Sequence, residues 1–366
     1  MFQSIQACRA LAAILVVCFH LAGNLAKDKY FGSIAAPLER LFVFGGSAGV
    51  AFFFVLSGFI ITHVHRADFG HPRRLGSYLR KRIARIYPTY LVVFAGVYLT
   101  AILVPSLRDA MPTDAAVLVK SLLLLPQDPA VVGGTGAPVI VVAWSLQYEV
   151  VFYVLVALAI VHPLLSAAAV ALFAANFIWH SWGGAREFPA SFFANELMLL
   201  FAMGVGAAAV GGAGWRMPKP LLVATAAGVL FFAVGAASIW RHDPHNTYFN
   251  FGYGICGAVA IVALIQAERE HPARFENRTL FLLGDASYAI YLIHFPLIAV
   301  LCKLALAAGL SGVSGMLVAF VGIGLACVAV SVLFHLWIER PMLRLVSRRG
   351  TRRPVEPAAS ECATGG

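Results

Sequence analysis

The chain has 366 residues, of which 60% are apolar and only 12% are charged, and its mean hydropathy is +0.83. Soluble domains carry about 25% charged residues, so this composition excludes an ordinary soluble protein and indicates a multi-pass membrane protein. The formal net charge of +10 does not indicate nucleic-acid binding, because the basic residues lie mainly between apolar runs, where they set orientation in a membrane.

Apolar runs long enough to cross a bilayer predict an all-α fold with about ten transmembrane helices. They cover residues 8–25, 45–65, 86–104, 139–161, 163–182, 190–210, 219–240, 249–267, 280–302 and 313–338. An apolar piece at 117–125 is too short to span and fits a re-entrant or interfacial segment. We expect residues 1–345 to form one transmembrane domain and 346–366 a disordered basic cytoplasmic tail.

The distribution of lysine and arginine predicts that both termini are cytoplasmic. With ten spans and an inner N-terminus, 19 of the 27 Lys and Arg residues fall on the cytoplasmic side and 8 on the other side. Positive residues concentrate on the inner side of membrane proteins. We therefore expect a multi-pass protein of the cell inner (plasma) membrane.

Metal-binding and disulfide patterns are missing from the sequence. The six cysteines have no spacing typical of a metal site or a disulfide framework. His63, His65, His242 and His245 lie near the ends of spans without a ligand constellation. We expect no bound metal and no bound cofactor.

The first span carries the residue on which most of the functional interpretation depends. His20 lies ~16 Å along the helix axis from Arg9, because a helix rises ~1.5 Å per residue. If Arg9 marks the inner edge of a ~30 Å hydrocarbon layer, His20 lies near its middle, where an ionisable group by default marks a functional site. The structural alternative is a histidine that forms hydrogen bonds between helices.

The second span and the segment after it add a hydroxyl group and a basic cluster. Ser57 lies ~12 Å below the outer edge and either acts chemically or, beside Gly58, allows close helix approach. The basic 66–85 segment by itself indicates only a loop held in the cytoplasm. Arg82 and Arg85, however, lie at i, i+3 on one helix face and can together clamp the phosphates of a cytoplasmic donor.

The fourth span opens with Trp144 and Ser145 and carries Glu149 ~12 Å deep, which leaves it ~18 Å from the inner edge. That depth matches the depth of His20 within about one helical turn, so the two residues can form an acid–base pair. A purely structural ion pair is the alternative, but buried pairs are poor stabilisers, which favours a function.

The ninth span carries Tyr288, Tyr291 and His294 at successive i, i+3 positions, a polar stripe that faces protein rather than lipid. The tyrosines lie too deep for an interfacial belt. Glu339 and Arg340 close the tenth span, where a helix-end salt link explains them as well as a function does.

These stretches together resemble the membrane-bound acyltransferase 3 family, over about residues 3–345. The matching motifs are R-x10-H at Arg9 and His20, FFxxSG from Phe52 to Gly58, RxxR at Arg82 and Arg85, WSLxxE from Trp144 to Glu149, and SYxxYLxH from Ser287 to His294. Within the family, the opening from Ser4 to Ala7 looks like that of the standalone exopolysaccharide O-acetyltransferases of the succinoglycan type.

The resemblance implies an integral membrane O-acyltransferase that uses cytoplasmic acyl-CoA, with acetyl-CoA as the expected donor substrate. The implied acceptor is a sugar hydroxyl of an exopolysaccharide, another cell-surface glycan or a lipid-linked saccharide. His20 would be the catalytic base and Glu149 would orient it, while Arg9, Arg82 and Arg85 would bind acyl-CoA. Substrate binding or transition-state stabilisation is expected of Ser57, Trp144, Ser145, Tyr288, Tyr291 and His294.

Several alternatives stay open from the sequence. His20 either acts as a base or is itself acylated transiently, and the acyl chain is acetyl, succinyl or longer. A transporter or flippase of lipid-linked saccharide is the rival class, although the sequence lacks the internal repeat and paired broken helices of many transporters. A structural assembly partner is a third option.

Overall fold

The structure is a computed structural model that describes residues 2–104, 108, 111–184 and 187–348. In this part of the chain every regular element is a helix. Ten helical segments are long and apolar enough to cross a membrane, which confirms the predicted all-α fold. The predicted tail lies outside the described residues from 349 onward, and residues 346–348 belong to the last helix.

The helices vary from membrane-spanning to single-turn elements. The long ones are α1 (Gln3–Leu25), α3 (Phe44–His65), α4 (Leu75–Leu103), α8 (Trp144–Val161), α9 (Pro163–Ser181), α11 (Leu197–Gly212), α12 (Pro220–Trp240), α13 (Thr247–Glu270), α15 (Ser287–Ala307) and α16 (Gly312–Phe334). The short ones are α2 (Ala36–Phe42), α6 (Ala115–Leu122), α7 (Pro129–Val132), α10 (Ala190–Phe193), α14 (Arg278–Asp285) and α17 (Arg340–Arg348). A π-helix, His335–Glu339, joins α16 to α17.

Local sequence explains several helix starts. The Asn246 side chain accepts a hydrogen bond from the backbone N–H of Tyr248 at the start of α13, and Asn277 caps α14 in the same way. Pro163 and Pro220 occupy the first positions of α9 and α12, where a missing N–H costs nothing. The short apolar piece near residue 117 forms α6, capped by its preceding aspartate, and does not span.

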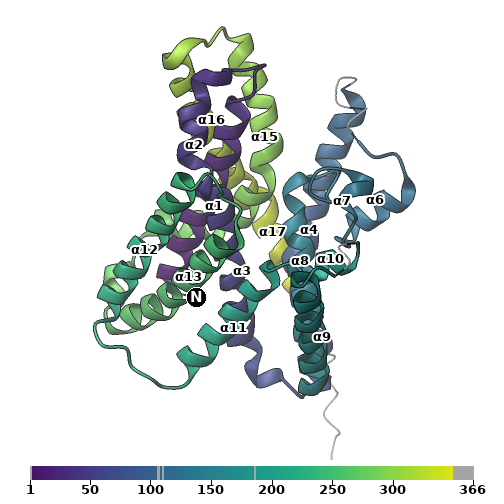
Figure 1. The fold of residues 1–366 in the computed structure, drawn as a ribbon, viewed down its shortest axis with the longest axis vertical. Helices are drawn as coiled ribbons and strands as arrows, with labels where there is room; N and C mark the ends of the chain where they lie inside the picture. The colour runs from purple at the N-terminus through teal and green to yellow at the C-terminus, as the bar shows by residue number, and fades with distance from the viewer. Residues whose placement is uncertain (1, 105–107, 109–110, 185–186, 349–366) are drawn as a thin grey trace, which may run out of the picture.

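Two groups of helices make up the molecule (Figure 1). One contains α4 and α6 to α10, and the other contains α1 to α3 and α11 to α16. The groups meet where α3, α15 and α17 pack against α4 and α8. Helices from both groups therefore line the region where the two groups meet.

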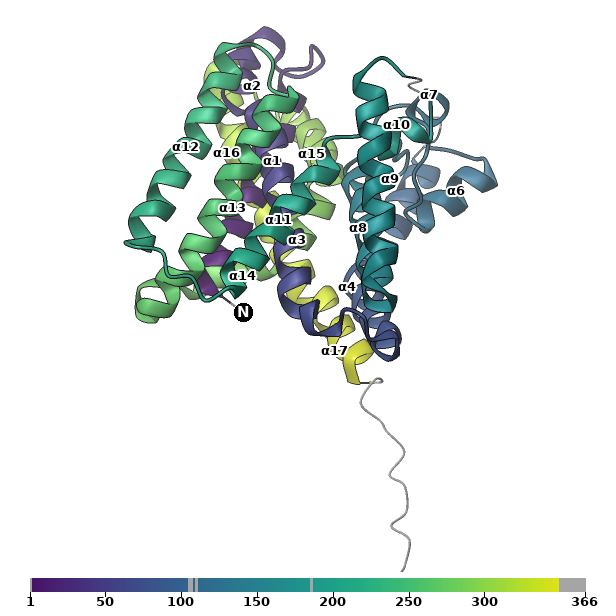
Figure 2. The ribbon, with the colours of Figure 1, turned by 60° about the horizontal axis from the view of Figure 1, so that its bottom comes forward.

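One end of the bundle collects the basic segments. Figure 2 shows the N-terminus, α14 and α17 at the bottom and α2 at the top. We call the end that carries Arg9, the 66–85 segment and α17 the basic face, and the end that carries α2 and the 241–246 loop the far face. The lysine and arginine distribution predicts that the basic face is cytoplasmic.

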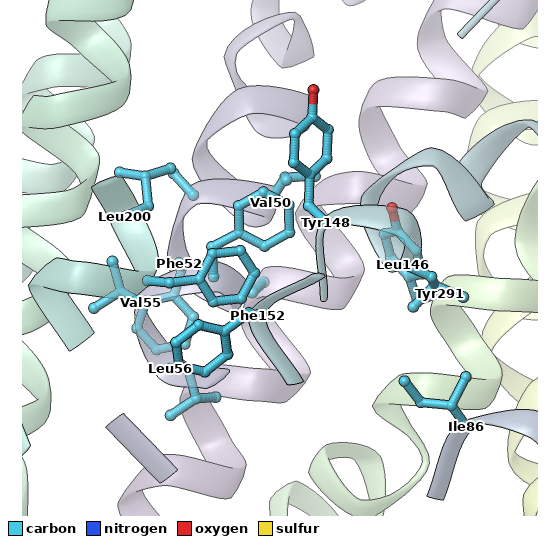
Figure 3. Close-up of a cluster of buried hydrophobic side chains, with 14 of the residues drawn as sticks. Val50, Phe52, Val55, Leu56, Ile86, Leu146, Tyr148, Phe152, Leu200 and Tyr291 are labelled. Carbon is cyan, nitrogen blue, oxygen red and sulfur yellow. The ribbon is translucent and has the colours of Figure 1, made fainter. Parts of the chain in front are cut away.

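The core next to this space is aromatic and closely packed (Figure 3). Phe54 and Phe152 both stack on Phe201, with ring centroids 4.5 and 4.6 Å away. Where α3 crosses α11, a Cβ atom on Gly58 would collide with the backbone of Phe201, and one on Gly204 would collide with the backbone of α3. Glycine at this crossing lets the two helices approach at backbone distance, as in other membrane helix pairs.

Candidate active site

A cavity of about 640 Å³ lies between the two helix groups. Its walls come from α1, α3, α4, α8, α15 and α17, and they extend from the basic face as far as Val50 and Phe53 on α3. Phe53 lies ~20 Å along α3 from Arg66, so the cavity reaches towards the middle of the bundle. Five cationic side chains line it, namely Arg9, Arg80, Lys81, Arg82 and Arg85.

Arg82 lies between two tyrosine rings on the cavity wall. Its guanidinium carbon is 5.9 Å from the ring centroid of Tyr78 and 5.8 Å from that of Tyr153, within the range of cation–π attraction. Its Nη2 reaches only the limit of hydrogen bonding to His65, at 3.5 Å. Its Nε is buried and has no hydrogen-bond acceptor among the described residues.

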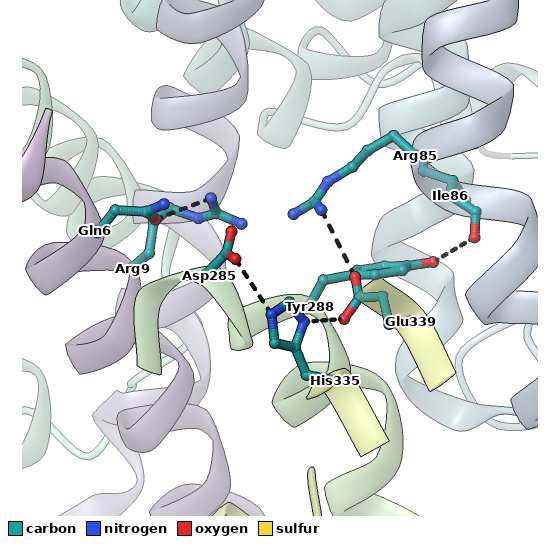
Figure 4. Close-up of polar contacts among 8 residues, drawn as sticks. All are labelled: Gln6, Arg9, Arg85, Ile86, Asp285, Tyr288, His335 and Glu339. Atoms are coloured by element: carbon teal, nitrogen blue, oxygen red, sulfur yellow. Dashed lines mark hydrogen bonds and ion pairs between the residues drawn. The ribbon is translucent and has the colours of Figure 1, made fainter. Parts of the chain in front are cut away.

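Arg85 is already charge-paired. Its Nη1 lies 3.6 Å from Oε1 of Glu339, and its guanidinium lies 5.7 Å from the ring centroid of Tyr288 (Figure 4). The Tyr288 hydroxyl donates to the backbone carbonyl of Ile86 at 3.0 Å. The predicted arginine pair thus does line one cavity, but a donor phosphate would have to compete with a carboxylate for Arg85.

A polar network continues from Glu339 across the basic face (Figure 4). The second Glu339 oxygen lies 2.8 Å from Nδ1 of His335, whose Nε2 lies 3.2 Å from the Asp285 carboxylate. The hydrogen bond from His335, and then the positive charges of Arg85 and Arg9, hold the pKa of Asp285 below its usual value although burial opposes them. Arg9 also donates to Gln6 at 3.1 Å. Glu339 therefore links the π-helix to α4, and no salt link between it and its neighbour Arg340 occurs among the described residues.

Glu149 lies in the cavity wall with two hydroxyl donors. The Tyr153 hydroxyl donates to its Oε1 at 2.7 Å, and the Ser57 hydroxyl donates to the same oxygen at 3.3 Å. Ser57 lines the cavity and is not the residue at the close helix crossing, because Gly58 has that position. Ser57 therefore lies in the cavity wall beside Glu149, and a chemical role for it stays a prediction.

His20 has different neighbours. Its Nδ1 lies 3.0 Å from the backbone carbonyl of Val16 and 3.0 Å from Nε2 of His294, and Phe19 and Phe295 present ring edges to it. It is not among the residues that line the cavity.

The predicted hydrogen-bonded pair of His20 and Glu149 is therefore not found among the interactions of the described residues. The depth estimate located each residue along its helix axis but not around it. Glu149 turns from α8 towards α3, whereas His20 turns from α1 towards α15. The side chain within hydrogen-bond distance of the His20 imidazole is that of His294. Catalytic roles for His20 and Glu149 stay predictions.

Tyr291 lies between the cavity and the histidine pair. Its hydroxyl donates to the backbone carbonyl of Val142 at 2.9 Å and lies 2.7 Å from the hydroxyl of Ser145, which also lines the cavity. Its ring centroid is 6.0 Å from that of Phe53 and 6.0 Å from that of His294. Trp144, in contrast, packs on Phe54 and Tyr148 and is not part of the lining, so the structure gives it a packing role.

The sequence interpretation missed Tyr153 and His335. Each has a partner one helical turn away, Glu149 and Glu339, and that i, i+4 spacing of a tyrosine or histidine with a glutamate inside an apolar span was a usable pattern. Among the described residues, no group of three or more His, Cys, Asp or Glu side chains is arranged to hold a metal ion.

Comparisons with known proteins identify the family of the chain. Residues 2–336 match the family described as the acyltransferase domain. The chain is similar to the acyltransferase MdmB of Streptomyces mycarofaciens, with 29% identity over 98% of this chain and 96% of MdmB. It is also similar to the exopolysaccharide production protein ExoZ of Rhizobium meliloti (strain 1021), with 28% identity over 85% of this chain and 92% of ExoZ. No solved structure gives a significant match.

Proposed function

The chain belongs to the acyltransferase domain family, and on that premise we propose that it moves an acyl group, acetyl being the expected one, from acyl-CoA to a sugar hydroxyl. The proposed acceptor is an exopolysaccharide or another cell-surface glycan, or its lipid-linked precursor. The enzyme class itself is a multi-pass membrane O-acyltransferase, so the rival class of transporter is set aside.

The cation-lined cavity is the observation that carries the choice of donor. Acyl-CoA presents phosphates at one end and a thioester on a long, narrow arm at the other. Arginine pairs phosphate well because its planar fork donates two hydrogen bonds at once. The cavity has five cationic side chains near the basic face and an uncharged aromatic end at Phe53 and Tyr291. Acyl-CoA fits it in one orientation, with the phosphates at the cationic end and the thioester at the aromatic end. The proposed location is the cell inner membrane, with the basic face cytoplasmic.

The choice of acceptor is supported by one relative. ExoZ is described as an exopolysaccharide production protein and is similar over 85% of this chain. A sugar hydroxyl is a weak nucleophile at neutral pH, and it needs a positioned base. His20 is the residue that we propose for this step.

In the proposed reaction the sugar oxygen attacks the carbonyl carbon of the thioester while Nε2 of His20 accepts the hydroxyl proton. The carbon–sulfur bond then breaks, and the same proton passes from His20 to the departing CoA thiolate. If His20 is instead acylated first, the same Nε2 attacks the carbonyl carbon of the thioester, the carbon–sulfur bond breaks and CoA leaves as a thiolate. The sugar oxygen then attacks the carbonyl carbon of the acyl-imidazole, the carbon–nitrogen bond breaks to return His20, and the hydroxyl proton goes to the CoA thiolate. In either route the acyl group has to reach past the Tyr291 ring, because His20 does not line the cavity.

Mass spectrometry of the surface polysaccharide tests this function. Cells with the protein should carry an acyl group on a defined sugar position, and cells without it should lack that group. The mass difference identifies the acyl chain and the fragment ions identify the position. Identical acylation in both cells, with purified protein that consumes no acyl-CoA, would contradict the proposal.

A further inference from the structure

The side chain within hydrogen-bond distance of His20 is that of His294, a histidine with no exposed surface. Both of its ring nitrogens are engaged. Nδ1 lies 2.9 Å from the backbone carbonyl of Ile290 one turn earlier in α15, and Nε2 lies 3.0 Å from Nδ1 of His20. The His20 Nδ1 also lies 3.0 Å from the carbonyl of Val16.

These contacts determine where the protons lie. A carbonyl oxygen can only accept a hydrogen bond, so Nδ1 of His294 carries a proton and donates it to Ile290. A neutral imidazole has one N–H, so Nε2 of His294 is left as an acceptor. The His20 Nδ1 must then be the donor, and it has two acceptors within reach, Nε2 of His294 and the carbonyl of Val16.

Every other placement of the protons on His20 and His294 leaves an unfavourable contact. With its proton on Nε2, His20 would turn the lone pair of Nδ1 against the carbonyl of Val16. His294 would then have to donate through Nε2, which either turns its own Nδ1 lone pair against the carbonyl of Ile290 or requires a charged imidazole in a fully buried site. Burying an isolated charge is strongly unfavourable.

We infer that His294 is a positioning residue that holds His20 as the Nδ1–H tautomer, so that the lone pair of Nε2 is the one available to a substrate. The geometry supports the tautomer by itself, and the catalytic consequence rests on the proposed function. A histidine base depends on the group at its other nitrogen for tautomer and orientation. Here a neutral histidine takes the place that a carboxylate has in many acid–histidine pairs.

Two substitutions separate positioning from packing. His294→Gln keeps both hydrogen bonds, because the amide oxygen can accept from His20 and the amide nitrogen can donate to Ile290. His294→Leu fills the space without either bond. We expect His294→Gln to retain kcat within about tenfold and His294→Leu to lose about 100-fold or more, the range for misplacing a general base. The KM for acyl-CoA should stay unchanged in both, since His294 does not line the cavity.

His63→Leu is the matched control. His63 is a half-buried histidine that stacks on Phe59 and does not line the cavity, so its replacement should leave kcat unchanged. Equal losses in His294→Gln, His294→Leu and His63→Leu would overturn the inference, because they would report packing alone.

Nitrogen-15 NMR of histidine-labelled protein in lipid discs reads the tautomer without any assay of activity. The His20 resonances are identified as those lost in His20→Asn. We expect a protonated Nδ1 and an unprotonated Nε2 on His20 in the wild-type protein and in His294→Gln, and a mixture of tautomers in His294→Leu. A protonated Nε2 on His20 in the wild-type protein would overturn the inference, even if acyl transfer is confirmed. If acyl transfer fails instead, the same spectra still decide the tautomer.

Discussion

Arg85 and Glu339 form an ion pair across 254 positions of the sequence, with Nη1 of the arginine 3.6 Å from a carboxylate oxygen that has no exposed surface. The pair joins the π-helix to α4 in the cavity wall. It also occupies an arginine that the proposed donor needs. Removing the arginine leaves the buried carboxylate with His335 as its remaining partner, which is costly because half of its pairing is lost.

A double-mutant cycle on this pair separates binding from stability. Arg85→Ala should raise the KM for acyl-CoA about tenfold, the value of roughly one charge-assisted hydrogen bond, and should also lower the melting temperature. Adding Glu339→Gln should restore part of the melting temperature, because the buried carboxylate that lost its arginine is gone, but should leave KM raised. If the second substitution restores both quantities, Arg85 acts only through the fold.

Arg82 should recognise the phosphates of the donor. Arg82→Ala is expected to raise the KM for acetyl-CoA about tenfold and to leave the KM for S-acetylpantetheine, which has no phosphates, unchanged. Arg73→Ala is the control, because Arg73 is exposed on the same basic segment and does not line the cavity. An equal rise in KM for both donors would show that Arg82 does not recognise the phosphates of the donor.

Phe53 should limit the length of the acyl chain, since it lies at the inner end of the cavity beside Tyr291. Phe53→Ala is expected to raise the ratio of kcat/KM for butyryl-CoA over acetyl-CoA about 30-fold, because butyryl has two more methylenes than acetyl and each contributes ~1 kcal/mol or more in an apolar pocket. Ile60→Ala, on the same wall two turns nearer the basic face, should leave the ratio unchanged. If Ile60→Ala changes the ratio and Phe53→Ala does not, the donor binds in another orientation.

Glu149 and His20 should act independently, because each has its own hydrogen-bond partners. In a catalytic unit, the loss of a second member costs little once the first is gone. Here the activation free energies lost in His20→Asn and Glu149→Gln should add in the double variant within about 0.5 kcal/mol. A double variant no slower than His20→Asn alone would contradict independence and support the acid–base pair that the sequence predicted.

The sequence predicted the membrane spans well because hydropathy is a property of consecutive residues. It could not predict which residues meet across helices. Equal depth suggested that His20 and Glu149 are partners, but depth says nothing about the direction in which a side chain points. The ion pair of Arg85 with Glu339 likewise joins two helices that are far apart in the sequence, and their proximity cannot be deduced from one sequence.

The polar stripe on α15 shows a second limit. The i, i+3 spacing predicted one stripe that faces protein, but Tyr288 and Tyr291 line the cavity whereas His294 contacts α1. Each three-residue step falls ~60° short of a full helical turn, so two steps rotate the direction by ~120°. The drift carries His294 away from the cavity and towards His20. This rotation explains why residues of one stripe contact both the cavity and His20.

The most direct test is transfer of radiolabelled acetyl from acetyl-CoA to extracted lipid-linked or polymeric saccharide by the purified protein in lipid discs, compared with His20→Asn at equal folded amounts. The account predicts labelled saccharide with the wild-type protein and a rate lower by about 100-fold or more with the variant, the contribution of a general base. Transfer at the wild-type rate by His20→Asn would contradict it.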